Sequence, residues 1–162
     1  IEKPKTSGSE FYVPSFFFVL WIIKKKVNLS KKIFIDFGSG KGRVLRYFIK
    51  HTKDIIGIEY NEHYKTNLPV NLSNKVIWED CYNNSFIEKI IEKYNGEELV
   101  VYFYHPFEET RINEIIYKFI YKIDNLTIVL IGDINLNLEN RKKCLKIYSN
   151  GNLIKIFSNK KN

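Results

Sequence analysis

The sequence contains no methionine and only two cysteines among its 162 residues. Cys81 and Cys144 are far apart and have no metal-ligand spacing, so the pattern excludes a disulfide framework and indicates a reducing, cytoplasmic setting. A chain that lacks methionine and begins with Ile1 is expected to be a trimmed or partial product. Residues ahead of it could then carry a membrane anchor or a substrate-binding element.

Long apolar runs are also missing. The longest one, residues 16–23, is much shorter than the roughly 20 residues that cross a bilayer, and no segment resembles a cleavable signal peptide. A membrane partner is therefore not expected. The chain is 44% apolar and 15% aromatic, which suffices for the core of one domain over residues 1–162. We expect an N-terminal segment and helix in residues 1–30, a core in 31–132, and a C-terminal helix and strand in 133–162.

Arginine is scarce, although the formal net charge is +8. A basic chain suggests a nucleic-acid partner. However, 22 of the basic residues are lysines and only four are arginines, and arginine makes the bidentate contacts that recognise bases and phosphates. We therefore expect a mostly solvated basic face, with nucleic-acid binding as the weaker alternative.

What the sequence does contain is an alternation of apolar runs and amphipathic stretches. Five β-branched, apolar runs predict strands at residues 32–37, 54–59, 75–79, 98–104 and 125–131. Helical spacing predicts helices at residues 41–51, 62–68, 86–94 and 108–121. This alternation predicts the α/β class, a three-layer sandwich on a mostly parallel sheet.

The two ends of the chain have less regular patterns. Ser15 can cap a helix over the apolar residues 16–23, with lysines 24–26 at its C-terminal end. Its apolar residues cover every face, which favours burial on the sheet over a position in a membrane interface. Residues 138–147 predict a further helix and residues 153–157 a last strand.

A glycine-rich turn follows the first predicted strand, where residues 35–45 read I-D-F-G-S-G-K-G-R-V-L. Gly38 and Gly40 allow a tight turn, and Gly42 allows close packing of the next helix. The helix N-terminus leaves amide donors free for an anionic group. A dinucleotide site has the spacing G-x-G-x-x-G. Here Asp36 precedes a G-x-G-x-G turn, and its carboxylate would repel a pyrophosphate but accept bonds from an ammonium group.

This segment closely resembles motif I of class I methyltransferases that depend on S-adenosylmethionine (AdoMet). The resemblance implies that Asp36 and the turn, including Ser39, bind the amino-acid end of AdoMet, and that AdoMet is the cofactor. It also implies a Rossmann-like sheet of six to seven strands in the order 3-2-1-4-5-7-6. A chain this short could have a shortened C-terminal hairpin.

Other segments lie where this family contacts the cofactor. Glu59 ends the second strand, where the family binds the ribose hydroxyls, and Tyr60 follows it beside the adenine region. Asp80 and Cys81 follow the third strand, where the family places an acid near the adenine amine and an amide near the ring. Alternatively, Asp80 caps the next helix. Tyr12, in a lead-in that resembles small bacterial members and non-SET lysine methyltransferases, is a candidate contact of the AdoMet carboxylate.

The fourth strand ends in Tyr104, His105, Pro106 and Phe107, where the family has its motif IV beside the methyl group. These residues resemble the Asn-Pro-Pro-(Phe/Tyr) motif of amino-group methyltransferases. In that motif the asparagine and a backbone carbonyl accept bonds from the target amine, and the aromatic ring stacks on it. His105 replaces the asparagine and one proline is missing. His105 could accept from the amine or act as a general base, or it could only shape the loop.

The resemblance implies a methyltransferase that acts on an amine nitrogen of a protein side chain, with lysine as one candidate. A nucleic acid or a small molecule is an alternative acceptor. A non-catalytic AdoMet-binding domain is a further alternative, because motif IV is altered and no C-terminal hairpin is evident. A nucleotide-binding oxidoreductase is disfavoured by Asp36 and by the glycine spacing.

Overall fold

The computed structural model describes residues 15–136, 138, 143–149 and 151–158. Seven strands form one sheet in the order β3-β2-β1-β4-β5-β7-β6. They are β1 (Ile33–Phe37), β2 (Asp54–Glu59), β3 (Val76–Trp78), β4 (Leu99–Tyr104), β5 (Leu126–Ile131), β6 (Lys143–Ser149) and β7 (Asn152–Ser158). The first five pair in parallel, and β7 runs antiparallel to both of its neighbours. The predicted class and strand order are confirmed.

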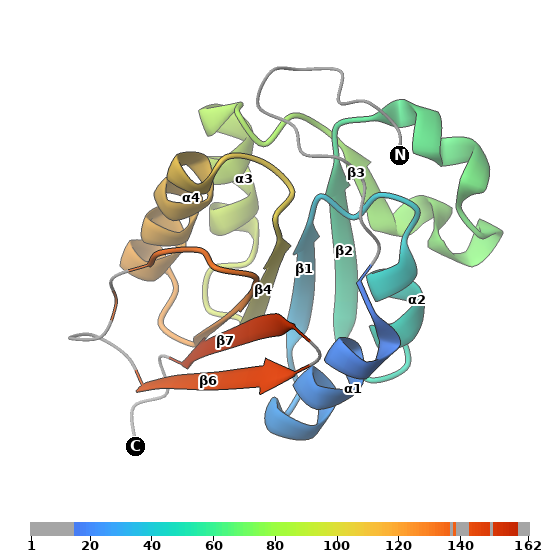
Figure 1. The fold of residues 1–162 in the computed structure, drawn as a ribbon. Coiled ribbons are helices and arrows are strands. Elements are labelled where there is room, and N and C mark those ends of the chain that lie inside the picture. Colours follow the sequence, from blue (N-terminus) through green and yellow to red (C-terminus); the bar gives the residue numbers. More distant parts are fainter. Residues whose placement is uncertain (1–14, 137, 139–142, 150, 159–162) are drawn as a thin grey trace.

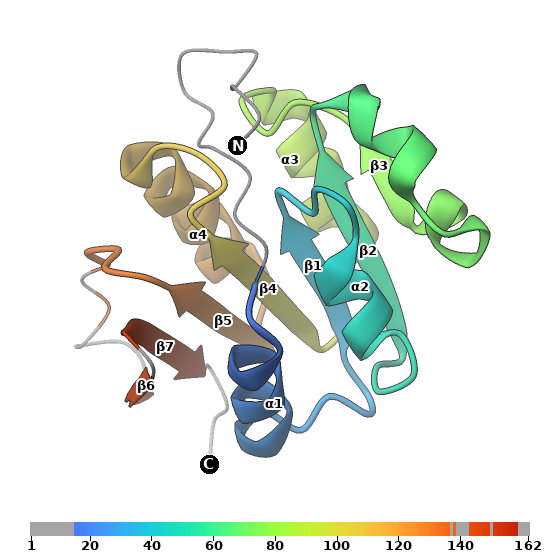
Figure 2. The ribbon, with the colours of Figure 1, turned by 45° about the vertical axis from the view of Figure 1, so that its right-hand side comes forward.

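Helices cover both faces of the sheet and complete the three layers (Figures 1 and 2). They are α1 (Phe17–Lys26), α2 (Arg43–Phe48), α3 (Asn84–Lys93) and α4 (Glu109–Lys122). Helices α1 and α2 pack on one face, and α3 and α4 pack on the other. The short helix predicted at residues 62–68 is a 3-10 segment, Glu62–Asn67, which a second one, Val70–Lys75, follows.

Strand β1 lies inside the sheet between β2 and β4, and all five of its residues are buried. Alternate side chains point to opposite faces. Phe34 stacks on Phe48 of α2 with ring centroids 4.8 Å apart, whereas Phe37 stacks on Phe103 and meets Phe119 of α4 edge-on. By the same alternation Asp36 lies on the α1/α2 side. The end of β1 is therefore held by packing on both faces.

The C-terminal hairpin corrects one prediction. Residues 138–147 were expected to be helical, but β6 pairs antiparallel with β7, which pairs with β5. The segment is short, and its apolar residues suit either a helix or a strand, so the pairing with β7 decides the outcome. The strand predicted at residues 153–157 is confirmed. Each strand of the hairpin has seven residues, so the hairpin is present and is not reduced to a remnant.

Helix α1 corrects two more predictions. Ser15 does not cap it; the helix begins at Phe17, and the Ser15 hydroxyl forms a hydrogen bond of 2.7 Å with the Tyr102 hydroxyl of β4. The predicted burial of α1 on the sheet is correct for only one side of the helix. The buried residues are Val19, Leu20, Ile22 and Ile23, and the exposed ones include Phe17, Phe18 and Trp21. Among the described residues, no helix has the length and apolar character that would span a membrane.

Candidate functional site

The glycine turn leaves β1 at the carboxyl edge of the sheet, where the strand order reverses between β1 and β4. Gly38, Gly40 and Gly42 have φ angles of 78°, 51° and 71°, which glycine adopts without strain. A Cβ at Gly38 would overlap the side chain of Pro106, from the loop after β4. The turn and the loop after β4 therefore fit together only because position 38 is a glycine.

The first three amides of this turn form bonds within the protein, so binding of an anion by the amides at the start of α2 stays a prediction. The amides of Gly38 and Ser39 donate to the carbonyl oxygen of Ile58, at 2.8 and 3.1 Å. The amide of Gly40 donates to Oε2 of Glu59 at 2.8 Å. The turn folds back onto the end of β2, which satisfies these donors. By contrast, the Ser39 hydroxyl is buried and has no hydrogen-bond partner among the described residues.

Asp36 is a buried carboxylate at the end of β1. Its side chain is nearly inaccessible, at 3% exposure, and it has no hydrogen bond or ion pair within the described part of the chain. Burial, and secondarily the charge of Glu59, raise the pKa of Asp36 well above its ordinary value. Buried carboxylates are normally paired. An unpaired one beside a glycine turn therefore indicates a site for a cationic group, which would stabilise the charged carboxylate.

Glu59 stands opposite the turn at the end of β2. Its Oε2 accepts from the Gly40 amide and its Oε1 accepts from the Asn61 amide, both at 2.8 Å. Burial raises the pKa of Glu59 even though these bonds favour its charged form. Because each carboxylate oxygen has more than one acceptor position, Glu59 can hold the turn and still accept from a ligand. The neighbouring Tyr60 is exposed.

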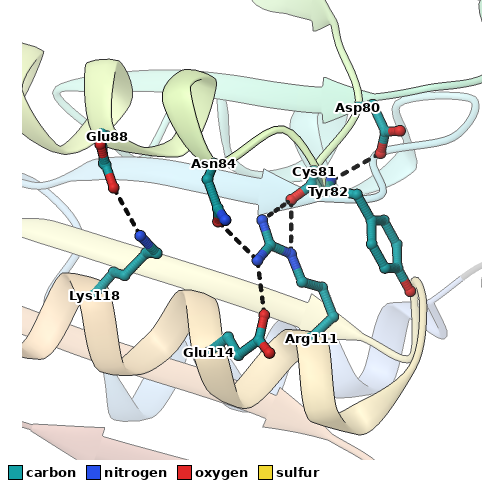
Figure 3. Close-up of polar contacts among 8 residues, drawn as sticks. All are labelled: Asp80, Cys81, Tyr82, Asn84, Glu88, Arg111, Glu114 and Lys118. Atoms are coloured by element: carbon teal, nitrogen blue, oxygen red, sulfur yellow. Dashed lines mark hydrogen bonds and ion pairs between the residues drawn. The ribbon is translucent and has the colours of Figure 1, made fainter.

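The loop after β3 is held by an arginine that the sequence did not single out (Figure 3). Arg111 reaches from α4, and its Nε and Nη2 donate to the carbonyl oxygen of Cys81 at 3.0 and 2.5 Å. Its Nη1 donates to Asn84 at 2.9 Å and to Glu114 at 2.8 Å. Its guanidinium also lies 5.6 Å from the centre of the Tyr82 ring. Only burial and these long-range partners distinguish Arg111 from the solvated cations of an amphipathic helix.

Asp80 and Cys81 lie in the loop that Arg111 holds. Asp80 does not cap α3: its carboxylate accepts from the amide of Tyr82 at 2.8 Å, and the cap is Asn83, which accepts from the amide of Phe86. The Asp80 side chain is half-buried. Burial raises the pKa of the Cys81 thiol, so this thiol is protonated and is a poor nucleophile. The loop thus offers a carboxylate and backbone groups.

The end of β4 places Tyr104 and His105 near the turn. Tyr104 is half-buried on the α1/α2 side. His105 is exposed and has a φ of 41°, a left-handed conformation that is uncommon for residues other than glycine. A Cβ at Gly132, after β5, would overlap Nε2 of His105. The imidazole therefore lies directly against Gly132. The backbone of His105 is in a strained conformation of the kind found at functional sites.

The other two motif IV residues support this loop from within. Pro106 packs against Gly38. The Phe107 ring is buried, with its centroid 6.4 Å from that of Phe103 and 6.0 Å from that of Tyr82. Tyr104 and His105 are therefore the more accessible aromatic groups, and stacking of Phe107 on an acceptor stays a prediction.

Tyr12 lies outside the described residues, so its predicted contact stays a prediction. The lead-in is described from Ser15, which is bonded to Tyr102. The carbonyl oxygen of Ser15 accepts from Nη1 of Arg43 at 3.3 Å. Tyr102 is the register partner of Asp36, so Ser15 is bonded to a side chain of the strand next to the buried carboxylate.

The sequence matches no protein-family model and no curated protein, but solved structures match its fold. An RNA methyltransferase from Salinibacter ruber in complex with S-adenosylhomocysteine has a TM-score of 0.59 at 13% identity, covering 90% of this chain and 93% of its own. An rRNA methylase from Streptococcus thermophilus has a TM-score of 0.61 at 13% identity, covering 91% and 98%. A candidate methyltransferase from Streptococcus mutans, also with S-adenosylhomocysteine, has a TM-score of 0.63 at 11% identity, covering 91% and 99%.

The chain has the class I methyltransferase fold. The sheet order and the antiparallel C-terminal hairpin are those expected from the sequence resemblance. Within the class I methyltransferase fold, the predicted site segments all lie at the carboxyl ends of neighbouring strands. Asp36 and the glycine turn follow β1, Glu59 ends β2, the Asp80 loop follows β3, and the His105 loop follows β4. The structure thus brings the described predicted residues to one edge of the sheet.

Proposed function

We propose that this protein is an AdoMet-dependent methyltransferase. The observation that carries this proposal is the buried, unpaired Asp36 carboxylate beside the glycine turn. AdoMet brings an ammonium group that can pair with this carboxylate, whereas a dinucleotide would bring a pyrophosphate and leave two negative charges together. Two of the neighbouring structures contain S-adenosylhomocysteine, the demethylated form of AdoMet, which supports the same choice.

The residues at this edge of the sheet fit AdoMet group by group. Asp36 would pair with its ammonium, and the buried, unpartnered hydroxyl of Ser39 would provide a further polar contact. Glu59 would accept from the ribose hydroxyls through the acceptor positions that Gly40 and Asn61 do not use. The Asp80 loop would face the adenine. AdoMet supplies the methyl group and the leaving sulfide, so the protein has to align the acceptor and exclude water.

The loop after β4 would bind and orient the methyl acceptor. A nitrogen nucleophile must attack as the free base, and His105 is the imidazole available to accept its hydrogen bond or its proton. The imidazole lies against the Gly132 backbone, which limits its movement on that side. Burial raises the pKa of Tyr104, so its hydroxyl would act as a neutral donor or acceptor. Pro106 and Phe107 would keep the loop in position.

The second part of the proposal concerns the chemical class of the methyl acceptor. A protein amine was predicted from the motif IV resemblance, but His105 replaces the residue on which that resemblance rests most. Two of the three neighbours described above are named for RNA substrates, which supports a nucleic-acid nitrogen as the acceptor to test first. A non-catalytic domain was an alternative because motif IV is altered and because no C-terminal hairpin was evident in the sequence. The hairpin of β6 and β7 removes the second of these reasons.

Calorimetric titration tests the cofactor. The wild-type protein should bind AdoMet and S-adenosylhomocysteine but not NAD; binding of NAD without AdoMet would contradict the proposal. Incubation with methyl-labelled AdoMet and separate RNA, DNA, protein and metabolite fractions then tests the acceptor. Label in the RNA fraction that is removed by ribonuclease is the expected result. Label in no fraction would favour a non-catalytic domain.

A further inference from the structure

The positive charge of the chain is concentrated in one segment. Residues 15–53 contain ten of the 26 basic residues but only one of the 18 acidic ones, and that acid is the buried Asp36. The remainder has 16 basic and 17 acidic residues, so the segment accounts for the whole positive excess. It forms α1, β1 and α2. Lys32 and Lys53 form ion pairs with Glu98 and Glu97, whereas the three lysines that end α1 are exposed.

A pocket of about 600 Å³ opens between the first turns of α1 and α2. Its lining, which we call the basic-aromatic pocket, consists of Phe17, Lys41, Arg43, Arg46 and Tyr47. It thus combines three cations with two aromatic rings and includes two of the four arginines in the sequence. The Phe17 ring is 63% exposed, 6.2 Å from the Tyr47 ring and 5.3 Å from the guanidinium carbon of Arg43.

More exposed rings lie on α1 and at the residue before it, near Phe17 in the sequence. Phe16 is 56% exposed, and the rings of Phe18 and Trp21 stack with centroids 5.7 Å apart. The Lys25 ammonium lies 5.8 Å from the Trp21 ring. Exposed apolar groups gathered in one place usually mark an interaction site. Because the inner side of α1 is already buried on the sheet, these rings are available to a partner.

Rings interleaved with arginine and lysine suit single-stranded nucleic acid. Bases stack on exposed aromatic side chains, while phosphates bind the cations beside them. An anionic membrane surface would also attract aromatic and basic residues, but it would meet a protruding face. Here Arg43, Arg46 and Tyr47 line a hollow, and the guanidinium fork of arginine matches a phosphate in geometry as well as in charge.

We propose that the basic-aromatic pocket binds single-stranded RNA, with a base stacked on Phe17 and phosphates held by Arg43 and Arg46. Lys41 and Arg43 flank Gly42, at the end of the glycine turn. RNA bound in this pocket would therefore run beside the proposed cofactor site. The inference that this RNA is the methyl acceptor rests on the proposed function; the binding itself does not require AdoMet.

Fluorescence anisotropy with a labelled single-stranded RNA of about 12 nucleotides tests the pocket, since single-strand binding sites span about 4–16 nucleotides. Phe17→Ser should weaken binding about 5- to 150-fold, the range for loss of one stacked base. Arg46→Glu should weaken binding and reduce the slope of log affinity against log salt by about 0.7–1. Matched controls on the α3/α4 side, Tyr121→Ser and Lys89→Glu, replace exposed residues and should bind RNA like the wild type.

Titrating the same variants with AdoMet separates the two proposals. Phe17 and Arg46 have no part in the proposed cofactor contacts, so both variants should bind AdoMet like the wild type and melt at similar temperatures. Equal RNA affinity in wild type, Phe17→Ser and Arg46→Glu would overturn the proposal that the basic-aromatic pocket binds RNA, whether or not AdoMet binds. RNA binding with no AdoMet binding would overturn only the proposed function. The RNA proposal would also be overturned if the wild type bound phosphatidylserine vesicles but no RNA, and if Phe17→Ser lost the vesicle binding.

Discussion

Replacing Asp36 by asparagine should raise stability and weaken cofactor binding at the same time. The amide is similar in size but has no charge to be desolvated. The wild-type carboxylate is 3% exposed and lacks a partner among the described residues. A buried polar group without a partner costs about 1–3 kcal/mol, and a charged one costs more; asparagine keeps the first cost and removes the excess that is due to the charge, which is about 1.4 kcal/mol for each unit by which burial raises the pKa. We therefore expect Asp36→Asn to gain about 1–3 kcal/mol near pH 8, which raises Tm by about 2–12 °C in a chain of this size.

This gain depends on pH in a definite direction. The raised pKa of Asp36 means that the folded state keeps a proton that the unfolded chain loses at its ordinary pKa of about 3.9. The folded state then binds more protons than the unfolded state, so the contribution of Asp36 to stability falls as pH rises from about 4 to the folded pKa. Asparagine does not titrate. The stability difference between variant and wild type should widen over this interval and then level off.

The same substitution should weaken AdoMet binding, because it removes a charged hydrogen bond worth about 1.5–3 kcal/mol. This corresponds to a Kd about 10- to 150-fold higher. Thermal melts followed by circular dichroism across pH, together with calorimetric titration, measure both effects. The exposed Asp124 provides the control Asp124→Asn, which should change neither. An Asp36→Asn protein that is less stable than the wild type at pH 8 and binds AdoMet normally would refute the reasoning.

Three other substitutions test the loops around this site. Arg111→Lys should weaken the binding of AdoMet and of adenosine by the same factor, both measured by calorimetry. The reason is that lysine cannot make the four bonds that position the Cys81 loop. Unchanged adenosine affinity would leave Arg111 a purely structural role. His105→Ala should keep AdoMet affinity but lower turnover about 100-fold or more, the usual contribution of a general base, whereas unchanged turnover would remove His105 from the reaction. Gly132→Ala should also lower turnover, because its methyl group would displace the imidazole, and it should lower Tm, because alanine is strained at a φ of 102°.

Much of the fold could be predicted from the sequence because its signals are local. The five parallel strands are short apolar runs, and each one begins and ends within one residue of the predicted bounds. Asp36 and the glycine turn are recognisable because their residues and spacing resemble motif I, and Glu59 is recognisable because it ends the next strand. Their positions at the carboxyl ends of adjacent strands follow from the parallel topology.

The features that could not be predicted depend on distant partners. Ser15 resembles a helix cap, but Tyr102, 87 residues away, provides its actual partner. Arg111 resembles a solvated cation until α4 packs beside the Cys81 loop. Helix α1 is apolar on every side, so periodicity cannot tell which side faces the sheet. The residues of β6 suit two periods, and only pairing with β7 selects the strand.

Two glycines that are distant in the sequence enclose the loop after β4. Pro106 occupies the space that a side chain at Gly38 would need, and His105 occupies the space that a side chain at Gly132 would need. The surfaces proposed above for methyl donor and acceptor are consequently interlocked and cannot vary independently. A different acceptor loop transplanted onto this scaffold would need the same two bare backbone positions beneath it. New acceptor specificity is therefore more easily obtained in the surrounding helices than in this loop.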